Sequence, residues 1–372
     1  MINLVNYDEF GPEKVIQVYN PKVGMKGFVV IDSLALGPGK GGIRMTPTVS
    51  IDEVSRLARV MTWKTSMADL PFGGAKSGII ADPKAISLEK KKEIIEAFAK
   101  ALKIVSPELY VAAPDINTAE REMEWYAKAN GSKKSCTGKP KKMGGLPHEL
   151  GSTGFGVFHA AKVAAEYAKL DLEKSTVAIE GFGNVGWFVA KFLSEADAKL
   201  VAISDSRGVI YNKAGLNFNK LAQVKEKNGT VIEYKPGKVL PSRDILKIKA
   251  DVLVTAAIPD LVKAGDVDDI NFKLIIEGSN IPMTSDVEEL LYKKGILVVP
   301  DFVANAGGVI SSYVEYIGGN EKKMFKLVEE KVVNNTRIVL DDAVNKVCKL
   351  RDCALEIAKK RVLEKCDVCK VA

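Results

Sequence analysis

A glycine motif between two apolar segments constrains the fold of this chain more than any other feature. Gly181, Gly183 and Gly186 are spaced as G-x-G-x-x-G, directly after a β-rich run at 175–180 and directly before an apolar helical run. In that position the glycines permit a tight turn, close approach of a pyrophosphate to the backbone, and close packing of helix on strand. The pattern therefore predicts a βα unit that binds a dinucleotide.

The cofactor preference is not decided by the residues that follow this motif. Asp205 ends the next predicted strand, near the position about 20 residues on where an acidic residue is expected to bind the adenosine ribose. Its carboxylate favours NAD. Arg207 could instead pair with a 2′-phosphate and admit NADP. The sequence therefore leaves NAD and NADP both open.

The order of expected elements indicates an α/β fold with a doubly wound parallel sheet. After a helix at 154–169 and the strand before the glycine motif, further strands are expected at 200–204, 252–255, 274–277 and 296–299. Short apolar strands that alternate with helices are typical of such sheets. The first part of the chain also alternates between strand and helix, with a strand expected over 23–36 and helices expected from Ser50 and over 88–105.

A chain of 372 residues is long enough for two domains. We expect a first domain over 1–150, completed by C-terminal helices at 316–372, and a NAD(P)-binding Rossmann domain over 151–315. The segment 130–146 is rich in Gly, Ser, Pro and Lys and predicts an exposed loop near the domain boundary.

Composition limits the classes of function. The net charge of +7 is spread along the chain, without the basic stripe of a nucleic-acid-binding protein. No apolar run is long enough to cross a membrane and the N-terminus does not resemble a signal peptide, so a cytoplasmic location is expected.

With two histidines, and no second ligand pair near Cys366 and Cys369, no metal site is expected. We expect those two cysteines to be reduced, with a disulfide as the alternative for a heat-adapted protein.

Three lysines stand out against their surroundings. The helix from Ser50 has an apolar stripe that predicts its next inward position at 64 or 65, and position 64 is Lys64. Lys40 and Lys76 each lie among glycines, at 37–44 and 71–78. Three converging cations would suit a substrate with two carboxylates and would lower one another's pKa. Asp115, which follows an apolar strand end, is a candidate proton shuttle.

These motifs resemble the glutamate, leucine, phenylalanine and valine dehydrogenases. The resemblance runs from about residue 15 to about 320 and rests on motifs at 37–44, 61–64, 71–79, 113–115, 152–157, 181–186, 277–284 and 300–312. It implies reversible oxidative deamination of an L-amino acid to a 2-oxo acid and ammonia through an imine, with reduction of NAD(P).

The resemblance also implies residue roles. Lys76 would be the base that activates water, Asp115 would move protons to and from the amino nitrogen, and Lys64 would hold the α-carboxylate. The other expected substrate-binding residues are Lys40, Gly73, Gly74, Thr153 and Ser312. Besides the glycine motif, Asp205 and Arg207, the cofactor would contact Asn184, Val185, Thr255, Ala256, Asn280 and Asn305.

Lys40 and Ser312 resemble the glutamate-specific members, in which a lysine and a hydroxyl meet the side-chain carboxylate. We therefore expect L-glutamate and 2-oxoglutarate as substrates. The alternatives are a leucine, branched-chain or aromatic amino-acid dehydrogenase, and a non-catalytic nucleotide-binding relative. The resemblance implies a homo-oligomer, with a hexamer favoured over the octamer of the leucine enzymes.

Overall fold

The computed structural model describes residues 5–369 and divides the chain into two compact units. Unit 1 contains Met1–Pro147, Val309–Met324 and Leu355–Ala372, and unit 2 contains His148–Gly308 and Phe325–Ala354. The sequence expectation assigned all of 316–372 to the first domain. In the structure most of the long helix α10 (Glu321–Lys346) belongs to unit 2, whereas most of α9 (Gly307–Tyr316) belongs to unit 1.

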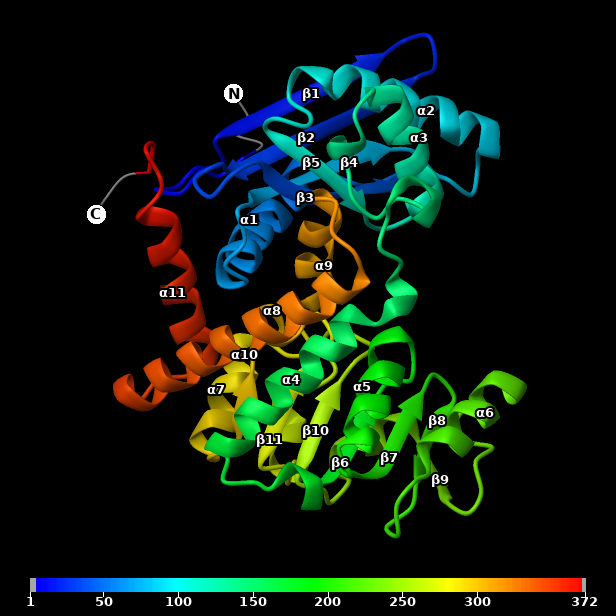
Figure 1. Cartoon of the computed structure of the whole chain (residues 1–372), viewed down its shortest axis with the longest axis vertical. Helices are drawn as coiled ribbons and strands as arrows, with labels where there is room; N and C mark the ends of the chain where they lie inside the picture. Colours follow the sequence, from blue (N-terminus) through cyan, green and yellow to red (C-terminus); the bar gives the residue numbers. More distant parts are fainter. Residues whose placement is uncertain (1–4, 370–372) are drawn as a thin grey trace. The chain divides into compact units, whose positions relative to one another are not determined.

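Unit 1 is built on a mixed five-stranded sheet (Figure 1). Its strands follow the order β1-β2-β4-β3-β5, and β3 runs parallel to both β4 and β5. β2 is antiparallel to its neighbours β1 and β4. The strands are β1 (Lys14–Asn20), β2 (Met25–Ser33), β3 (Gly39–Thr46), β4 (Gly73–Ile80) and β5 (Tyr110–Pro114).

Helices cover both faces of this sheet, so β2 is buried on both sides. Val29 and Ile31 join the core formed with α2 (Leu88–Ala101) and α3 (Glu120–Asn130). Phe28 and Val30 face the other way and pack with α1 (Ile51–Met67). This alternation follows from the two-residue period of a strand. The predicted start of α1 is confirmed, because the Ser50 side chain caps it by accepting a hydrogen bond from the backbone of the third helical residue (3.2 Å).

Unit 2 contains the predicted doubly wound sheet. The strand order is β12-β11-β10-β6-β7-β8-β9, and the strands from β12 to β7 are parallel. β8 and β9 extend the sheet as antiparallel strands that the sequence did not predict. The strands are β6 (Thr176–Glu180), β7 (Lys199–Asp205), β8 (Gly208–Tyr211), β9 (Lys238–Leu240), β10 (Val252–Thr255), β11 (Leu274–Glu277) and β12 (Leu297–Val299).

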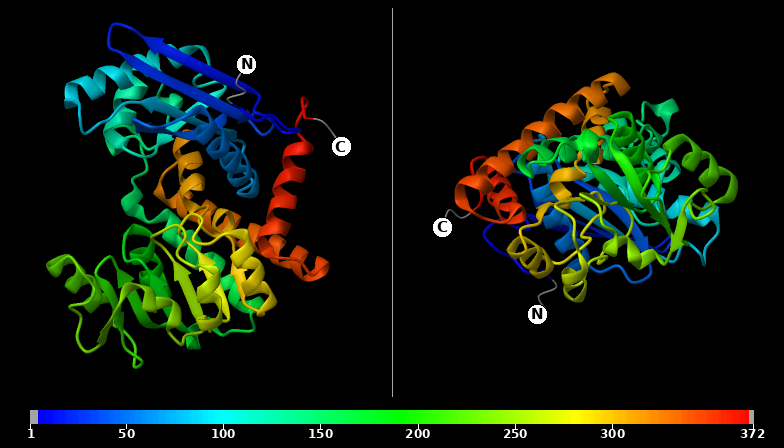
Figure 2. Two further views of the ribbon diagram at one scale, coloured as in Figure 1. Left: turned by 180° about the vertical axis from the view of Figure 1, so that it is seen from behind. Right: turned by 90° about the horizontal axis from the view of Figure 1, so that it is seen from below.

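The helices of unit 2 pack around this sheet. Besides most of α10 they are α4 (Ser152–Tyr167), α5 (Asn184–Glu195), α6 (Phe218–Asn228), α7 (Ser285–Lys293) and α8 (Asp301–Ala304). After α10 the chain turns sharply into α11 (Leu350–Leu363), seen where orange meets red in Figure 2. Within residues 5–369, no helix combines the length and apolar composition needed to cross a bilayer.

The lysine-rich segment 130–146 is only in part the exposed loop that its composition predicted. Lys133, Lys134, Lys141 and Lys142 are exposed, but the middle of the segment is not. Ser135, Cys136, Thr137 and Lys139 are buried. Lys139 donates to Glu315 of α9 (2.6 Å), and a buried partner of this kind offsets the cost of removing the ammonium from water. A sequence window does not reveal this partner, because Glu315 is distant along the chain.

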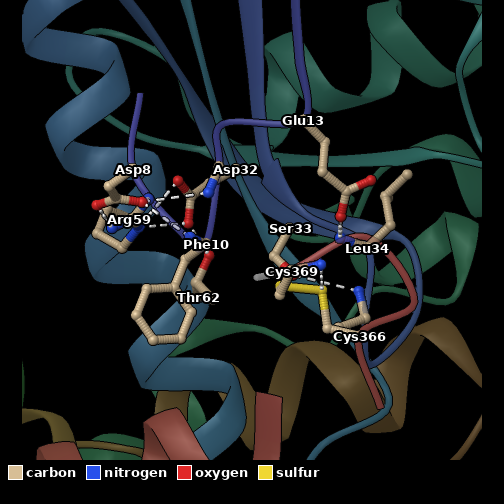
Figure 3. Close-up of a disulfide and its surroundings, with 12 residues drawn as sticks. Asp8, Phe10, Glu13, Asp32, Ser33, Leu34, Arg59, Thr62, Cys366 and Cys369 are labelled. Carbon is tan, nitrogen blue, oxygen red and sulfur yellow. Dashed lines mark hydrogen bonds and ion pairs between the residues drawn. A yellow bond between two sulfur atoms is a disulfide. The ribbon is translucent and has the colours of Figure 1, made fainter. Parts of the chain in front are cut away.

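The cysteines also differ from expectation. Cys366 and Cys369 form a disulfide, and so do Cys348 and Cys353. Figure 3 shows the Cys366–Cys369 bond near Leu34 of unit 1. In the same view, Arg59 of α1 donates to Asp32 (2.8 Å) and Asp8 (2.7 Å).

Candidate active site

The sheet order of unit 1 brings the expected base and proton shuttle together. Lys76 lies on β4 and Asp115 follows β5, with β3 between them. The Nζ of Lys76 lies 3.1 Å from Oδ1 of Asp115. The other carboxylate oxygen, Oδ2, accepts a hydrogen bond from Nε of Arg44 on β3 (2.9 Å). Arg44 also pairs with Glu53 of α1.

Burial and charge act in opposite directions on this pair. Burial lowers the pKa of Lys76, and the negative charge of Asp115 offsets part of that shift. Burial would raise the pKa of Asp115, but the charges of Lys76 and Arg44 outweigh it and hold this pKa below its ordinary value. The carboxylate is therefore ionised at neutral pH, while the amine is closer to its neutral form than a free lysine.

Lys40 is more deeply buried, with 1% of its surface exposed. Its Nζ donates to the backbone oxygen of Ala112 (2.8 Å), and among residues 5–369 no carboxylate lies within ion-pair distance of it. Burial lowers its pKa to about 7. A buried cation whose nearest partner is a neutral carbonyl can bind a carboxylate ligand strongly.

Lys64 lies beside the buried face of α1 and not on it. The buried residues of this helix include Val54, Ala58, Thr62 and Thr65. Lys64 is half-buried. Of the two inward positions that the sequence allowed, Thr65 is therefore the buried one.

The glycines before Lys76 are explained by packing of the backbone. Gly73 and Gly74 are both buried. A Cβ at Gly74 would lie 2.0 Å from Oγ1 of Thr62, and a Cβ at Gly73 would lie 1.9 Å from the backbone oxygen of Ser33. These glycines therefore let α1 and the end of β2 approach β4 closely. This packing role is separate from the substrate-binding role expected from the sequence.

Ser312 lies on α9 and is half-buried. One turn later on the same helix, the Glu315 carboxylate accepts hydrogen bonds from the backbone amides of Gly138 (3.1 Å), Lys139 (3.2 Å) and Leu146 (3.1 Å). This carboxylate therefore ties the segment 138–146 to the helix that carries Ser312. Thr153 is half-buried on α4 of unit 2.

In unit 2 the glycine motif forms the predicted turn between β6 and α5. Gly181 has a φ of +92°, and a Cβ at Gly186 would lie 1.9 Å from the backbone oxygen of Gly181. A Cβ at Gly183 would meet no atom within 4 Å. Gly181 and Gly186 therefore serve the turn itself, while Gly183 leaves room for a ligand at the start of α5, where backbone amides attract phosphate.

A cavity of about 520 Å³ opens at this turn. Its lining includes the turn residues 181–183, the end of β7 at 204–206, and residues 256–258 after β10. A cavity at the carboxyl ends of parallel strands is where doubly wound sheets bind nucleotides. The residues present therefore fit a dinucleotide.

Asp205 differs from the sequence expectation in its surroundings. Its carboxylate accepts hydrogen bonds from four groups of the protein: Nζ of Lys225 (2.8 Å), Oγ1 of Thr230 (3.2 Å), and the amides of Arg207 (2.9 Å) and Val231 (2.8 Å). These bonds compete with the ribose hydroxyl for its lone pairs. The Arg207 side chain is exposed, and within residues 5–369 its guanidinium makes no hydrogen bond or ion pair.

The remaining expected cofactor residues lie at or near the ends of the parallel strands. Thr255 is buried and accepts a hydrogen bond from Ser279 (2.9 Å), and Ala256 lines the cavity. Asn305 is buried and donates to Oδ1 of the exposed Asn280 (3.1 Å). At the start of α5, Asn184 is exposed and Val185 is half-buried.

Sequence reasoning missed two residues of these sites. Arg44 stood within the quoted motif 37–44 but received no role, and its contact with Asp115 depends on the pairing of β3 with β5. Lys225 lies on α6, outside every motif, so no sequence signal pointed to its ion pair with Asp205.

A doubly wound nucleotide-binding unit, together with a second unit that holds a largely buried Lys–Asp pair, is typical of a two-domain nucleotide-dependent enzyme. Two family models match the chain. The Glutamate/Leucine/Phenylalanine/Valine dehydrogenase model matches residues 144–368, and the Glu/Leu/Phe/Val dehydrogenase dimerisation-domain model matches residues 12–131. The chain belongs to this family.

Similar proteins agree with this assignment. The chain is 38% identical to a glutamate dehydrogenase of Aeropyrum pernix, over 97% of this chain and 94% of that protein. It is 36% identical to an NADP-specific glutamate dehydrogenase of Saccharolobus shibatae, over 95% of this chain and 88% of that protein. The hetero-hexameric glutamate dehydrogenase of Thermus thermophilus superposes with a TM-score of 0.83 at 27% identity, covering 97% of this chain and 91% of that one.

Proposed function

We propose that this chain catalyses the reversible, NAD(P)-dependent oxidative deamination of L-glutamate to 2-oxoglutarate and ammonia. The observation that carries the proposal is the contact between Lys76 and the half-buried Asp115 (3.1 Å). This reaction needs one group to take protons from nitrogen and another to take a proton from water. The lowered pKa of Asp115 keeps its carboxylate ionised, and the lowered pKa of Lys76 brings its amine closer to the neutral form, so both shifts suit these tasks.

The steps assigned to the chain follow from those ionisation states. Asp115, held ionised by Lys76 and Arg44, accepts a proton from the substrate ammonium. A dinucleotide held at the cavity beside the glycine turn would supply the acceptor for the hydride of the α-carbon. Lys76 in its neutral form then takes a proton from the water that attacks the resulting imine, and Asp115 returns a proton to the departing nitrogen. Lys64 would pair with the α-carboxylate, and Gly73 and Gly74 keep side chains away from the strand that carries Lys76.

Glutamate is favoured over leucine by Lys40. Its ammonium is buried without a carboxylate partner among residues 5–369, and the side-chain carboxylate of glutamate would supply one. An apolar substrate would offer Lys40 no carboxylate, so this buried amine would gain no ion pair from it. Ser312 and Thr153 would add hydroxyl donors. The names of the curated relatives support the same substrate.

Substrate choice is tested by initial rates of reductive amination with ammonium and either 2-oxoglutarate or 4-methyl-2-oxopentanoate. We expect wild type to prefer 2-oxoglutarate and Lys40→Leu to lose that activity. Lys26→Leu, which removes an exposed lysine from β2, is the matched control and should keep it. Preference of wild type for the branched oxo acid would make the chain a leucine-type enzyme, and no turnover with either would favour a non-catalytic relative.

We propose further that NADP(H) is bound at least as well as NAD(H). Lys225 neutralises Asp205 (2.8 Å), and both residues line the nucleotide cavity together with Arg243. A 2′-phosphate would therefore meet cations, including the exposed Arg207, and not an open carboxylate. In Lys225→Gln the Asp205 carboxylate is released from its ion pair, so the ratio of kcat/KM for NADPH to that for NADH should fall. Lys227→Gln, an exposed lysine on the same helix, should leave the ratio unchanged.

We also propose that the chain assembles as a homo-oligomer, with a hexamer favoured. The match to the family's dimerisation domain and the hexameric state named for the Thermus thermophilus relative support this. Light scattering coupled to size-exclusion chromatography gives the mass directly. A mass of one chain would contradict the proposal.

A further inference from the structure

The turn between α10 and α11 is closed by a disulfide that no step of the proposed reaction uses. Cys348 and Cys353 are bonded, so the residues between them, among them Arg351, lie inside a small covalent ring. Val347, directly before the ring, has a φ of +55°, which a β-branched residue rarely adopts. The bond therefore restrains a turn that its own sequence does not favour.

Arg351 emerges from this ring and meets three carboxylates of unit 2. Its Nη2 lies 2.7 Å from Glu277, its Nε lies 2.7 Å from Glu288, and its Nη1 lies 3.0 Å from Asp301. These partners come from β11, α7 and α8. Their side chains are 0%, 4% and 10% exposed, so one guanidinium compensates three acidic groups that are almost entirely removed from water.

Two of these carboxylates, Glu277 and Asp301, hold the backbone segment that follows β11. Oε2 of Glu277 accepts from the amide of Asp301 (2.9 Å), and Oδ2 of Asp301 accepts from the amide of Ile281 (3.0 Å). Ile281 has a φ of +47°, an uncommon conformation for a β-branched residue. It directly follows Asn280, which we expect to contact the cofactor. Arg351 thus anchors both ends of the segment 277–281 without lining the nucleotide cavity itself.

Loss of Arg351 would remove the cation that these carboxylates share. Burial raises the pKa of Glu277 well above its ordinary value and also raises that of Glu288, so these groups tolerate little further loss of positive charge. Without the guanidinium, the carboxylates must take up protons or move towards water. Either change would alter the hydrogen bonds that fix the segment 277–281.

We propose that Arg351 is a positioning residue for the nucleotide site, and that the Cys348–Cys353 disulfide is a redox-sensitive clasp that keeps Arg351 on its three carboxylates. The inference rests on the proposed NAD(P)-dependent function. It makes nucleotide affinity dependent on the oxidation state of a cysteine pair outside the site.

A dithiol reductant can reach the disulfide at Cys348. Cys348 is half-buried and lines a cavity of about 240 Å³ together with Lys349 and Arg351, whereas Cys353 is fully buried. A thiolate of the dithiol attacks Sγ of Cys348, the S–S bond breaks, and Cys353 leaves as a thiolate and takes up a proton. The second thiol of the reductant closes a cyclic disulfide and releases Cys348. The pair gains two electrons and two protons, and the dithiol loses them.

The test is the dissociation constant of NADPH and of NADH for the whole chain, measured by fluorescence before and after dithiothreitol, with thiols counted. For the nucleotide that the untreated protein binds more tightly, reduction should raise the dissociation constant roughly threefold to thirtyfold. The KM for 2-oxoglutarate should stay the same. The double variant Cys348→Ser/Cys353→Ser should bind the nucleotide weakly before any treatment, and dithiothreitol should not change its dissociation constant. Cys366→Ser/Cys369→Ser removes the other disulfide and should respond like wild type.

Arg351 is tested in the same assay. Arg351→Gln should raise the nucleotide constant, and Arg351→Lys should restore part of the affinity because it returns the charge without all three contacts. An unchanged constant after full reduction, a Cys348–Cys353 pair that is already reduced in the purified protein, or equal changes in the KM of nucleotide and oxo acid would overturn the proposal. Wild type that binds neither nucleotide would instead overturn the proposed function.

Discussion

Lys139 and Glu315 form a buried ion pair of 2.6 Å, with side chains 4% and 2% exposed. Glu315 also accepts three backbone amides of the segment 138–146, so its charge is held by four donors, whereas Lys139 has Glu315 and the backbone oxygen of Cys136 (2.6 Å) as acceptors. The two halves of the pair are therefore unequal. The carboxylate is the more important member, because its loss leaves more buried donors without a partner.

That inequality predicts unequal losses of stability. Glu315→Leu should cost about 3 to 5 kcal/mol of unfolding free energy, since it strands a buried ammonium and three amides. Lys139→Met should cost less, because the three amides still stabilise the carboxylate. Urea unfolding of both variants measures the difference. Lys90→Met, at an exposed pair with Glu93, is the control and should change stability by about 1 kcal/mol or less. Equal losses at Lys139 and Glu315 would contradict this account.

The contact between Lys76 and Asp115 predicts a shift in the pH dependence of deamination. Because the role proposed for Lys76 is that of a base in its neutral form, kcat should rise as the pH increases through its lowered pKa. Asp115 raises the pKa of Lys76, so Asp115→Asn should move this acid limb to lower pH while reducing kcat by about 10²- to 10⁴-fold. An acid limb that moves to higher pH in Asp115→Asn would show that another group is the base.

Lys40 predicts proton uptake when the oxo acid binds. Its pKa of about 7 leaves the side chain mostly neutral at about pH 8. A bound carboxylate would raise that pKa, so the lysine should take up a proton on binding. Calorimetric titration of 2-oxoglutarate in buffers of different ionisation enthalpy measures the uptake. It should disappear in Lys40→Leu and persist in Lys26→Leu; the same uptake in both variants would place the protonated group elsewhere.

The glycines of the nucleotide turn should separate stability from binding. Gly186→Ala places a Cβ 1.9 Å from the oxygen of Gly181 and should lower stability by about 1 to 3 kcal/mol. Gly183→Ala has open space and should leave the melting temperature unchanged. It should weaken NADPH binding by about tenfold or more, because the methyl group would fill space that we expect the phosphates to use. Gly265→Ala, also in open space but outside the nucleotide cavity, is the control. Unchanged NADPH binding in Gly183→Ala would place the phosphates elsewhere.

Local sequence determined most of the elements. The strands predicted at 252–255 and 274–277 are confirmed with the same bounds, and the cap at Ser50 is confirmed by its hydrogen bond. Periodicity, capping and the glycine spacing act over a few residues, so a window of sequence contains the physics that decides them. The family assignment follows for a similar reason, because each motif is a short contiguous run.

Tertiary structure decided the partners of the charged groups. That Arg44 and Lys76 share Asp115, that Lys225 neutralises Asp205, and that Arg351 serves three carboxylates all depend on strand order and on helices distant in the chain. The burial of Lys139 in a lysine-rich segment has the same origin. The environment of a charged side chain is set by the elements that pack against it. Composition alone predicts that such residues are exposed to solvent. The sequence by itself thus determined which chemistry-bearing residues the chain has, and the fold decided which of them are charged, paired and buried.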